Sequence, residues 1–451
     1  MNEQLDFLFK DGLVVNAEGI TRADVGVRGE KIAIIAPQID ATRAKKVIDA
    51  SGKYVMPGAI DPHCHPVYVD NLRDSSITAA HGGVTSIIHY AYAKPGMQIL
   101  PVIDQFRTEG ESGSVLDFGL HLGLFDVKNQ IKDVEAAFDK GITSFKIFMT
   151  YAKLQWMTDD YWMTALMNVL GKKKGLVMVH TENGLATDYL EDKFNSEGAD
   201  PVKVFTAVRP DLLEGEAVNR SIALAQVMSC AIYIVHNSAA ACIEPLQKAK
   251  AKGWKVIGET CPHFLTLTDE TTMKFKAQAK VGPPLRTKMD NAALWKGLAD
   301  DTLQTIGSDH APKNKTIEED FFKAPYGAPQ IETMLPVIYH EGINGGKITL
   351  PRLVEVMSAN VAKVFGLYPK KGVIKTGSDA DIVLYDPNCR WTISIANQHS
   401  NVNYTLFEGK EVLGKPVLTM SRGAVIIENN KLAATTGVGK FMETDTSHFY
   451  K

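Results

Sequence analysis

The feature that most constrains the fold is a long alternation of short apolar runs and amphipathic segments between residues 56 and 368. Runs rich in β-branched and aromatic residues predict strands, and apolar residues three or four apart between them predict helices. The strand-like runs are the segment before His63 and residues 84–90, 118–125, 145–150, 176–180, 232–236, 255–259 and 305–308. Eight such units predict an α/β fold of the (β/α)8, or TIM barrel, type.

Both ends of the chain have a different pattern, in which short β-rich runs are separated by turns. These runs are residues 13–16, 25–28, 31–35, 381–385, 417–420 and 424–428. We therefore expect antiparallel strands from residues 1–55 and 369–432 to form one small β-sandwich domain together. Residues 56–368 would form the catalytic barrel, and residues 433–451 a C-terminal tail that contacts other subunits.

Composition argues against several classes of protein. The 451 residues have a formal net charge of -3 and no long basic run, so nucleic acid and anionic membranes are not expected partners. The first residues lack a signal pattern, and no apolar stretch approaches the roughly 20 residues that span a bilayer. The five cysteines lack paired spacing, which is typical of reduced thiols. We expect a cytoplasmic protein.

Separated polar side chains lie near the ends of the predicted barrel strands. They are His63, His65, Lys146, His180, His236 and Asp309. Alternate residues of a strand point to one side, so His63 and His65 can face a common centre. Active sites of such barrels lie where strands end, and these residues belong to strands one, four, five, six and eight. Together they can hold two metal ions, although a lone strand-end histidine can also be a hydrogen-bonded core residue.

Lys146 is unusual because it lies in an apolar strand. An isolated buried ammonium is unfavourable, so this lysine must lose its proton, pair with a carboxylate or be modified. Its neutral amine can take up carbon dioxide to form a carbamate, N6-carboxylysine, which resembles a carboxylate and can bridge two metals. Asp309 can then bind one metal, hydrogen-bond a bridging hydroxide, and act as general base and later as proton donor.

Several stretches together resemble the hydantoinase and dihydropyrimidinase family of the amidohydrolase superfamily, over nearly the whole chain. They are Met56–His65, Ser144–Tyr151, His180–Gly184, Arg209–Ala217, Glu259–His263, Gly282–Arg286, Ser308–Pro312 and Gly377–Asp381. The resemblance implies a metal-dependent hydrolase that opens the ring of a small cyclic amide. Its products would be N-carbamoyl amino acids, made from hydantoins or dihydropyrimidines.

The resemblance also implies how the ligands divide between two divalent ions. One ion has His63, His65 and Asp309, the other has His180 and His236, and carboxylated Lys146 and a hydroxide bridge both. Zinc is the usual ion in that family. Imidazole and carboxylate ligands suit zinc, although manganese, cobalt or iron can occupy such a site.

Further roles follow from the same resemblance. Tyr151 corresponds to the family's tyrosine that donates to the oxyanion. The loops that hold the amide edge of the ring, largely by main-chain groups, correspond to Gly282, Pro283, Tyr326 and Gly327. Family members commonly form tetramers in which the C-terminal tail reaches a neighbour, and residues 437–441 resemble the start of that tail. We therefore expect a homotetramer.

Some positions depart from the family pattern and leave alternatives open. Only 16 residues separate His65 from the Gly82-Gly83 turn, which is shorter than usual, so the size and chirality of the ring substituent stay open. Val67 stands where dihydroorotases have an arginine, which disfavours dihydroorotate. An allantoinase or another cyclic imide or lactam hydrolase is an alternative. A non-catalytic dihydropyrimidinase-like scaffold is an alternative of another class, but the complete set of ligand types favours an enzyme.

Overall fold

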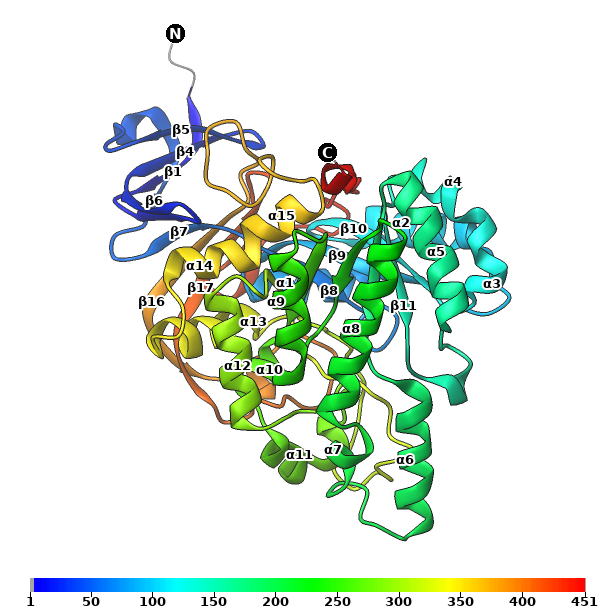
Figure 1. Cartoon of the computed structure of the whole chain (residues 1–451). Coiled ribbons are helices and arrows are strands. Elements are labelled where there is room, and N and C mark those ends of the chain that lie inside the picture. The colour runs from blue at the N-terminus through cyan, green and yellow to red at the C-terminus, as the bar shows by residue number, and fades with distance from the viewer. Residues whose placement is uncertain (1–3, 451) are drawn as a thin grey trace.

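A barrel of eight parallel strands occupies the middle of the chain, as predicted, in the computed structural model, which describes residues 4–450 (Figure 1). The strands pair in chain order: β8 Ala59–Cys64, β9 Val84–Ala93, β10 Asp117–Leu124, β11 Ser144–Phe148, β12 Leu176–His180, β13 Ala231–Ile234, β14 Val256–Thr260 and β15 Thr305–Ile306. A bridge between Cys64 and His310 links the first strand to the segment after the last. Every residue of β9 and β10 is buried, as expected where helices cover a parallel sheet.

Helices alternate with these strands and surround the barrel (Figure 1). They are α1 Leu72–His81, α2 Ile99–Gly113, α3 Val127–Gln130, α4 Val134–Phe138, α5 Asp160–Lys173, α6 Gly184–Ser196, α7 Phe205–Val208, α8 Asp211–Val227, α9 Ile243–Ala251, α10 Pro262–Thr266, α11 Asp269–Phe275, α12 Lys288–Ala299, α13 Met334–Ile338, α14 Leu350–Val354 and α15 Asn360–Val364. Local sequence sets several of their ends. In α12, for example, Thr287 and Asp290 form a reciprocal capping box that satisfies backbone donors of the first turn.

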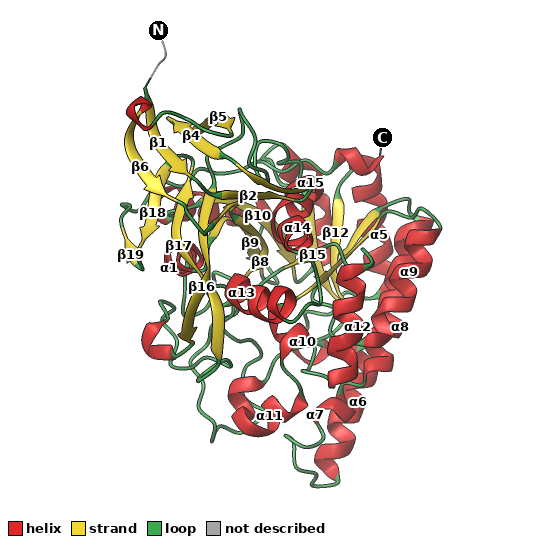
Figure 2. Ribbon diagram, turned by 90° about the vertical axis from the view of Figure 1, so that its left-hand side faces the viewer, coloured by secondary structure: helices red, strands yellow, loops and turns green. Residues whose placement is uncertain are grey.

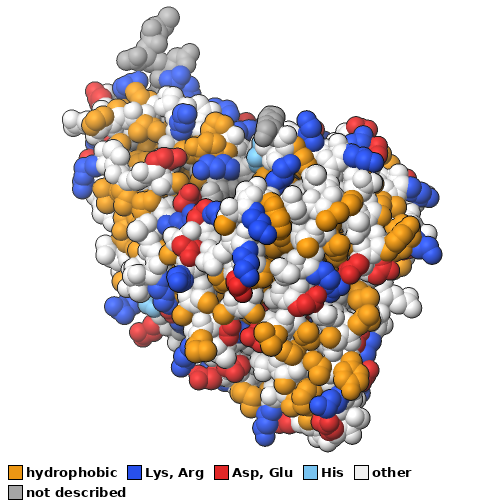
Figure 3. All heavy atoms as spheres, viewed as in Figure 1, with side chains coloured by type: hydrophobic (Ala, Val, Ile, Leu, Met, Phe, Trp, Pro, Cys, Tyr) orange, Lys and Arg blue, Asp and Glu red, His pale blue; other side chains and the backbone are white. Residues whose placement is uncertain are grey.

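The surface of this helical layer is mostly of mixed charge. Figure 3 shows lysine and arginine side chains interspersed with acidic ones, in agreement with the small net charge of -3. Hydrophobic side chains gather at the lower right of the same view, over α6 and α8 (Figures 1 and 3). Within residues 4–450, no helix combines the length and the apolar character that crossing a bilayer requires.

Strands from both ends of the chain form two further sheets beside the barrel (Figure 2). One has the order β5-β4-β1-β6 and the other β19-β18-β17-β16-β7-β2-β3. Their bounds are β1 Leu5–Lys10, β2 Leu13–Asn16, β3 Gly19–Arg22, β4 Asp24–Arg28, β5 Lys31–Ala36, β6 Ala44–Asp49, β7 Tyr54–Pro57, β16 Ile382–Thr392, β17 Glu411–Ser421, β18 Ala424–Glu428 and β19 Lys431–Leu432. Val25, Ile48, Ile382 and Met420 share one buried core, so the two ends of the chain do fold together.

The expectation of purely antiparallel pairing is wrong, because both terminal sheets are mixed. β1 pairs with β6 in parallel, and β2 pairs with β7 in parallel. Alternation of apolar and polar residues fixes which face of a strand is buried, but it is the same for either strand direction. The relative direction of two paired strands depends on the path of the segment that connects them. The apolar and polar pattern within each strand gives no information about that path.

A buried ion cluster joins the barrel to the C-terminal sheet. The Lys371 ammonium lies 2.7 Å from Asp117 on β10, 2.7 Å from Asp381 and 3.1 Å from Asp379. The carboxylates raise the pKa of Lys371 above its ordinary value against the effect of burial. The Gly377–Asp381 stretch, which contributes to the family resemblance, therefore has a structural position away from the predicted ligands.

The C-terminal tail lies against its own barrel. The Met442 amide donates to the Phe118 carbonyl at 2.7 Å, and the Tyr450 hydroxyl donates to the Gly175 carbonyl at 2.6 Å. The Arg107 guanidinium covers the Phe441 ring at 4.6 Å. These contacts attach the tail to the barrel of its own chain.

Candidate metal centre and active site

Two histidines and an aspartate form the first part of the predicted ligand cluster. His63 lies in β8 and His65 follows it, so that both rings reach the same oxygen of Asp309, three residues after β15. The distances from Asp309 Oδ1 are 3.2 Å to His63 Nε2 and 2.9 Å to His65 Nε2. One ligand atom from each residue lies within 4.8 Å of the others, which suits a single metal ion.

His180 and His236 form the second part. His180 ends β12, and His236 lies two residues beyond β13 on the neighbouring strand. The Nδ1 atom of His180 and the Nε2 atom of His236 are 3.0 Å apart. Two nitrogen ligands about 2.0 Å from one tetrahedral zinc ion lie roughly 3.3 Å from each other, so this pair has suitable spacing. The rings of His63 and His236, 5.4 Å apart, bring the two parts together.

Lys146 is buried between the two parts, with 1% of its surface exposed. It lies in the middle of β11 rather than at a strand end. Its ammonium nitrogen is 5.4 Å from the centre of the Tyr90 ring, which contacts His63 and His65, and 5.3 Å from the centre of the Phe148 ring beside His180. Burial lowers the pKa of Lys146 to about 7, so a neutral amine is accessible near neutral pH.

The donor set fits divalent metal ions. Among the described residues, the buried Nε2 of His63 faces Asp309 Oδ1 at 3.2 Å but has no hydrogen-bond partner, which is unusual for a buried polar atom. Burial lowers the pKa of His65 to about 4, which keeps this imidazole in the neutral form that binds metals. Burial opposes charge on His63 too, but the carboxylates of Glu259 and Asp309 raise its pKa to about 9. A cation that binds here must displace that proton.

A second layer of carboxylates orients the histidines, and sequence reasoning assigned it no role. Glu259, at the end region of β14, accepts from His63 Nδ1 at 2.6 Å, from the His236 amide at 2.9 Å and from the Tyr233 hydroxyl at 2.8 Å. Such partners fix the ring tautomer and raise the basicity of a metal-binding histidine. Among the last five barrel strands, β14 is the one without a predicted metal ligand. Its acidic residue Glu259, which faces the cluster, could have been recognised from the sequence for that reason.

Glu182 and Arg209 orient the other histidine pair. His180 Nε2 lies 2.6 Å from Glu182, and Glu182 in turn pairs with Arg209. All three side chains are buried. Although burial raises the pKa of a carboxyl group, the Arg209 guanidinium and His180 hold the pKa of Glu182 at about 2. The carboxylate is therefore charged at any pH at which the protein is folded and active.

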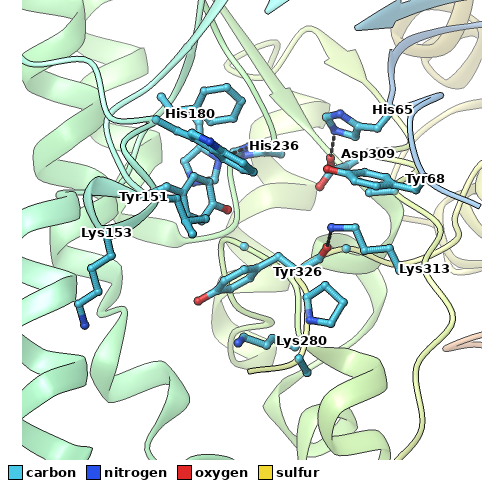
Figure 4. A pocket seen from close by; sticks show the side chains of 18 of the residues that line it. His65, Tyr68, Tyr151, Lys153, His180, His236, Lys280, Asp309, Lys313 and Tyr326 are labelled. Atoms are coloured by element: carbon cyan, nitrogen blue, oxygen red, sulfur yellow. Dashed lines mark hydrogen bonds and ion pairs between the residues drawn. The ribbon is translucent and has the colours of Figure 1, made fainter. Parts of the chain in front are cut away.

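The ligand cluster lines a cavity of about 400 Å³ (Figure 4). Tyr151, Gly282, Tyr326 and Gly327, all predicted from the sequence, line this cavity together with the histidines of the cluster. Pro283, also predicted, follows Gly282 across a cis peptide bond and does not belong to the lining residues.

Gly282 and Tyr326 are neighbours in the wall of the cavity, where the small residue leaves room for the large one. A Cβ atom at position 282 would lie 2.9 Å from the Tyr151 hydroxyl and 3.1 Å from the Tyr326 ring. A side chain at this position would therefore press on the Tyr151 hydroxyl and on the edge of the Tyr326 ring. The glycine leaves the space that these two aromatic side chains occupy.

Three site residues have backbone conformations that are unfavourable for L-amino acids. The φ angles of Tyr151, His236 and Asp309 are 68°, 39° and 51°. Each left-handed residue costs on the order of 1 kcal/mol. Such strain commonly marks functional sites, where the surrounding structure imposes the geometry that the chemistry needs.

The fold and this cluster define a class, namely (β/α)8 barrels with a buried histidine and carboxylate centre for metal. Comparison with known proteins identifies the family. Residues 54–425 match the model of the amidohydrolase family, and the chain belongs to that family.

The relatives resemble the chain over their whole length. The D-hydantoinase of Ralstonia pickettii is 36% identical, with 97% of this chain and 99% of that protein covered. The dihydropyrimidinase of Rattus norvegicus is 34% identical, with 98% and 89% covered. The crystal structure of dihydropyrimidinase from Brevibacillus agri superposes with a TM-score of 0.93 at 38% identity, with 97% of this chain and 98% of that chain covered. The resemblance inferred from the motifs is confirmed.

Proposed function

We propose that the protein hydrolyses the cyclic amide bond of hydantoins or dihydropyrimidines to give N-carbamoyl amino acids. The observation that carries this proposal is the buried cluster of His63, His65, Lys146 and Asp309 that lines the cavity, in a chain similar over its full length to hydantoinases and dihydropyrimidinases. A cavity of about 400 Å³ suits a small ring with one substituent.

The proposal is tested by offering metal-loaded protein a panel of small rings. Hydantoin, 5-substituted hydantoins, dihydrouracil, allantoin and succinimide form a suitable panel, because they also cover the alternative cyclic amide hydrolases. A product heavier than the substrate by one water, identified by mass spectrometry as an N-carbamoyl amino acid, is the expected result. Metal-loaded protein that hydrolyses no ring would contradict the proposal. A non-catalytic scaffold would, in addition, be purified with neither stoichiometric metal nor carboxylated Lys146.

We assign the ligands as the family pattern implies. His63, His65 and Asp309 would hold one ion, His180 and His236 the other, and Lys146, as a carbamate, would bridge both. Two divalent ions, of which zinc suits these ligands best, would activate a water molecule and polarise the substrate carbonyl. The carbamate removes the unfavourable burial of a cation at Lys146, since it replaces a positive charge by a negative one.

Asp309 is the residue we assign to proton transfer. Burial raises the pKa of a carboxyl group, but His63 and His65 hold the pKa of Asp309 well below its usual range, so it begins as a carboxylate. It can therefore take a proton from the attacking water and deliver it to the ring nitrogen that leaves. Its left-handed backbone, with a φ angle of 51°, aims the carboxylate at both histidines.

Tyr151 is the donor that we assign to the developing oxyanion. Its ring packs against His180 at 5.3 Å, and its hydroxyl lies on the cavity side next to Gly282. Burial raises the pKa of Tyr151 well above its ordinary value, so the hydroxyl keeps its proton and can donate it in a hydrogen bond.

Replacing Tyr151 with phenylalanine should lower kcat by about 100- to 1,000-fold, because one preorganised oxyanion donor is lost. KM should change little, since the hydrogen bond strengthens mainly in the transition state. Steady-state kinetics on the best ring of the panel measures both constants. The control is Tyr161→Phe, at a residue that is 72% exposed. An unchanged kcat in Tyr151→Phe would remove the tyrosine from the mechanism.

We further propose that the protein is a homotetramer. Large apolar side chains are exposed on neighbouring helices, namely Tyr161 (72%), Leu185 (65%), Tyr189 (68%) and Leu212 (74%). Arg220 of α8 pairs with Asp160 of α5 at 2.8 Å, and Asn183 at the start of α6 donates to Glu216 of α8, so these helices adjoin. Exposed apolar groups of this kind favour contacts between copies. Analytical ultracentrifugation should give four times the 49.4 kDa chain mass, and a monomer at micromolar concentration would contradict this.

We also propose that the chemistry and its structural support belong to different segments of the chain. Residues 56–368 would carry the chemistry, and the sheets built by residues 1–55 and 369–432 would support the barrel. All five cysteines are free, which agrees with a reducing compartment and supports the proposed cytoplasmic location.

A further inference from the structure

One side of the cavity carries two lysine ammonium groups, one buried and one partly buried, that the proposed reaction does not use. Lys280 and Lys313 both line the cavity and flank Tyr326 (Figure 4). The Lys280 nitrogen lies 4.5 Å from the centre of the Tyr326 ring and donates to the Phe322 carbonyl at 2.8 Å. The Lys313 nitrogen donates to the Tyr326 carbonyl at 2.7 Å. Hydantoins and dihydropyrimidines themselves are neutral rings, so they give no reason for cations here.

The nearby Lys315 is a lysine whose ammonium has a purely structural role, and its hydrogen bonds serve as a comparison. Its ammonium donates to three backbone carbonyls, those of Lys280 at 3.2 Å, Pro325 at 3.3 Å and Gly327 at 2.7 Å. An ammonium has three N–H groups, so Lys315 is fully satisfied. Lys280 and Lys313 each have one such acceptor. Two N–H groups on each therefore remain for a ligand or for water.

No carboxylate in residues 4–450 neutralises these two cations at close range. Neither nitrogen lies within 4.0 Å of a carboxylate oxygen. Burial lowers the pKa of each to about 8, although the more distant carboxylates of Glu191, for Lys280, and Asp309, for Lys313, partly oppose this effect. Two unpaired like charges in one partly desolvated wall are unfavourable unless an anion joins them.

The other charged groups of the cavity already have partners. Lys153 lies 3.1 Å from Glu191 and 2.6 Å from Asp192, and Lys323 lies 3.3 Å from Asp320. Arg209 is paired with Glu182. The acidic lining residues outside the metal cluster, Asp188 and Glu191, both belong to α6, on the side of Lys153. The wall of Lys280 and Lys313 is therefore the cationic one.

Lys313 is well placed to meet a ring substituent. Figure 4 shows its amine on the cavity side, below Tyr68 and Asp309 and beside Tyr326. The nitrogen lies 3.8 Å from the centre of the Tyr68 ring. Tyr68 comes from the short segment after His65, whose length left the substituent open in the sequence. A group attached to a ring bound above the metal ligands can extend toward this wall.

We propose that the ring substituent of the substrate carries a carboxylate, and that Lys313 and Lys280 bind it. This inference rests on the proposed ring hydrolysis and narrows it to rings derived from acidic amino acids. The absence of an arginine at Val67 disfavours a carboxylate attached directly to the ring in the dihydroorotase manner, whereas the two lysines suit one on a short side arm. The carboxylate would replace the missing counter-ion of both ammonium groups.

A matched pair of substrates isolates the charge. Racemic 5-(2-carboxyethyl)hydantoin and 5-(2-carbamoylethyl)hydantoin have the same shape, and the carboxymethyl and carbamoylmethyl pair tests a shorter arm. With the metal-loaded protein, kcat/KM for one of the carboxylates should exceed that for its amide by at least about tenfold, as expected for charge-assisted hydrogen bonds. Lys313→Met and Lys280→Met should each remove most of this preference by raising KM for the carboxylate alone.

Two further variants separate contact from bulk charge. Lys313→Arg keeps the cation and should retain part of the preference. Lys288→Met removes a distant lysine whose side chain is 79% exposed, and it should leave the preference unchanged. Thermal melting of each variant checks that it is folded. Loss of the preference in Lys288→Met to the same degree would show that net charge, not contact, is responsible and would overturn the inference.

Binding of the same compounds, measured by calorimetry, distinguishes failure of the inference from failure of the proposed function. If both amides are hydrolysed with the same kcat/KM as the corresponding carboxylates, the inference is overturned while the proposed function stands. If a carboxylate binds in a Lys313-dependent way but no ring is opened, the function fails and the inference survives. If no compound of either pair binds or reacts, both are overturned.

Discussion

Replacing Lys146 with alanine should abolish ring hydrolysis and reduce the metal content of the purified protein. The side chain is 1% exposed and lies between the His63 group and the His180 group, where a carbamate would bridge two ions. Without that bridge, kcat should fall at least about 1,000-fold, because activation of water and polarisation of the carbonyl both depend on the ions. Atomic emission analysis and turnover on the same preparation measure the two effects.

The carbamate itself gives two sharper readouts. Protein prepared with 13C-bicarbonate and zinc should show a carbamate carbon signal that is absent from Lys146→Ala. The neutral amine reacts with carbon dioxide, and burial lowers the pKa of Lys146 to about 7. At a constant carbon dioxide pressure, carbamate formation on Lys146 in metal-free protein should therefore increase as the pH rises through 7. The exposed Lys172 supplies the control variant Lys172→Ala, which should behave as wild type. Full activity in Lys146→Ala would contradict the proposed centre.

Replacing Asp309 with asparagine should reduce kcat by about 100- to 10,000-fold, the usual range for loss of a general acid and base. Asparagine has the same shape but cannot take the proton from water at neutral pH. Its amide oxygen can still meet the histidines that lie 2.9 and 3.2 Å from Asp309, so the protein should fold and keep part of its metal. Turnover should therefore be expressed per bound metal ion.

The control for this variant changes a carboxylate outside the ligand cluster. Asp320→Asn, at a half-exposed carboxylate near the cavity mouth, is the matched control and should retain wild-type kinetics. Normal turnover per metal in Asp309→Asn would assign proton transfer to another group.

The arrangement of Gly282 and Tyr326 shapes one wall of the cavity. The glycine admits the tyrosine ring, which would otherwise lie 3.1 Å from a Cβ atom. The Tyr326 ring faces the Lys280 nitrogen at 4.5 Å, and its carbonyl accepts a hydrogen bond from the Lys313 ammonium. In barrels of this type, loops commonly select the substrate while residues at the strand ends carry the chemistry.

The sequence by itself was sufficient for the barrel, for most strand positions and for the six ligand candidates. Buried parallel strands are apolar along their whole length. A histidine or lysine in such a strand is recognisable as functional, because burying a polar or charged side chain is unfavourable unless it has a partner. His63, His180 and Lys146 were recognisable on that basis. The family motifs then connected them, and the comparisons confirm the family.

Tertiary structure alone decided how these residues meet and what supports them. The mixed pairing of the terminal sheets and the hydrogen bonds that Glu259 makes with His63 and His236 join segments far apart in the chain. So does the wall of Lys280 and Lys313, since these two side chains flank one tyrosine although they are 33 positions apart. Local patterns record burial and periodicity, but contacts between distant segments arise only when the chain closes on itself.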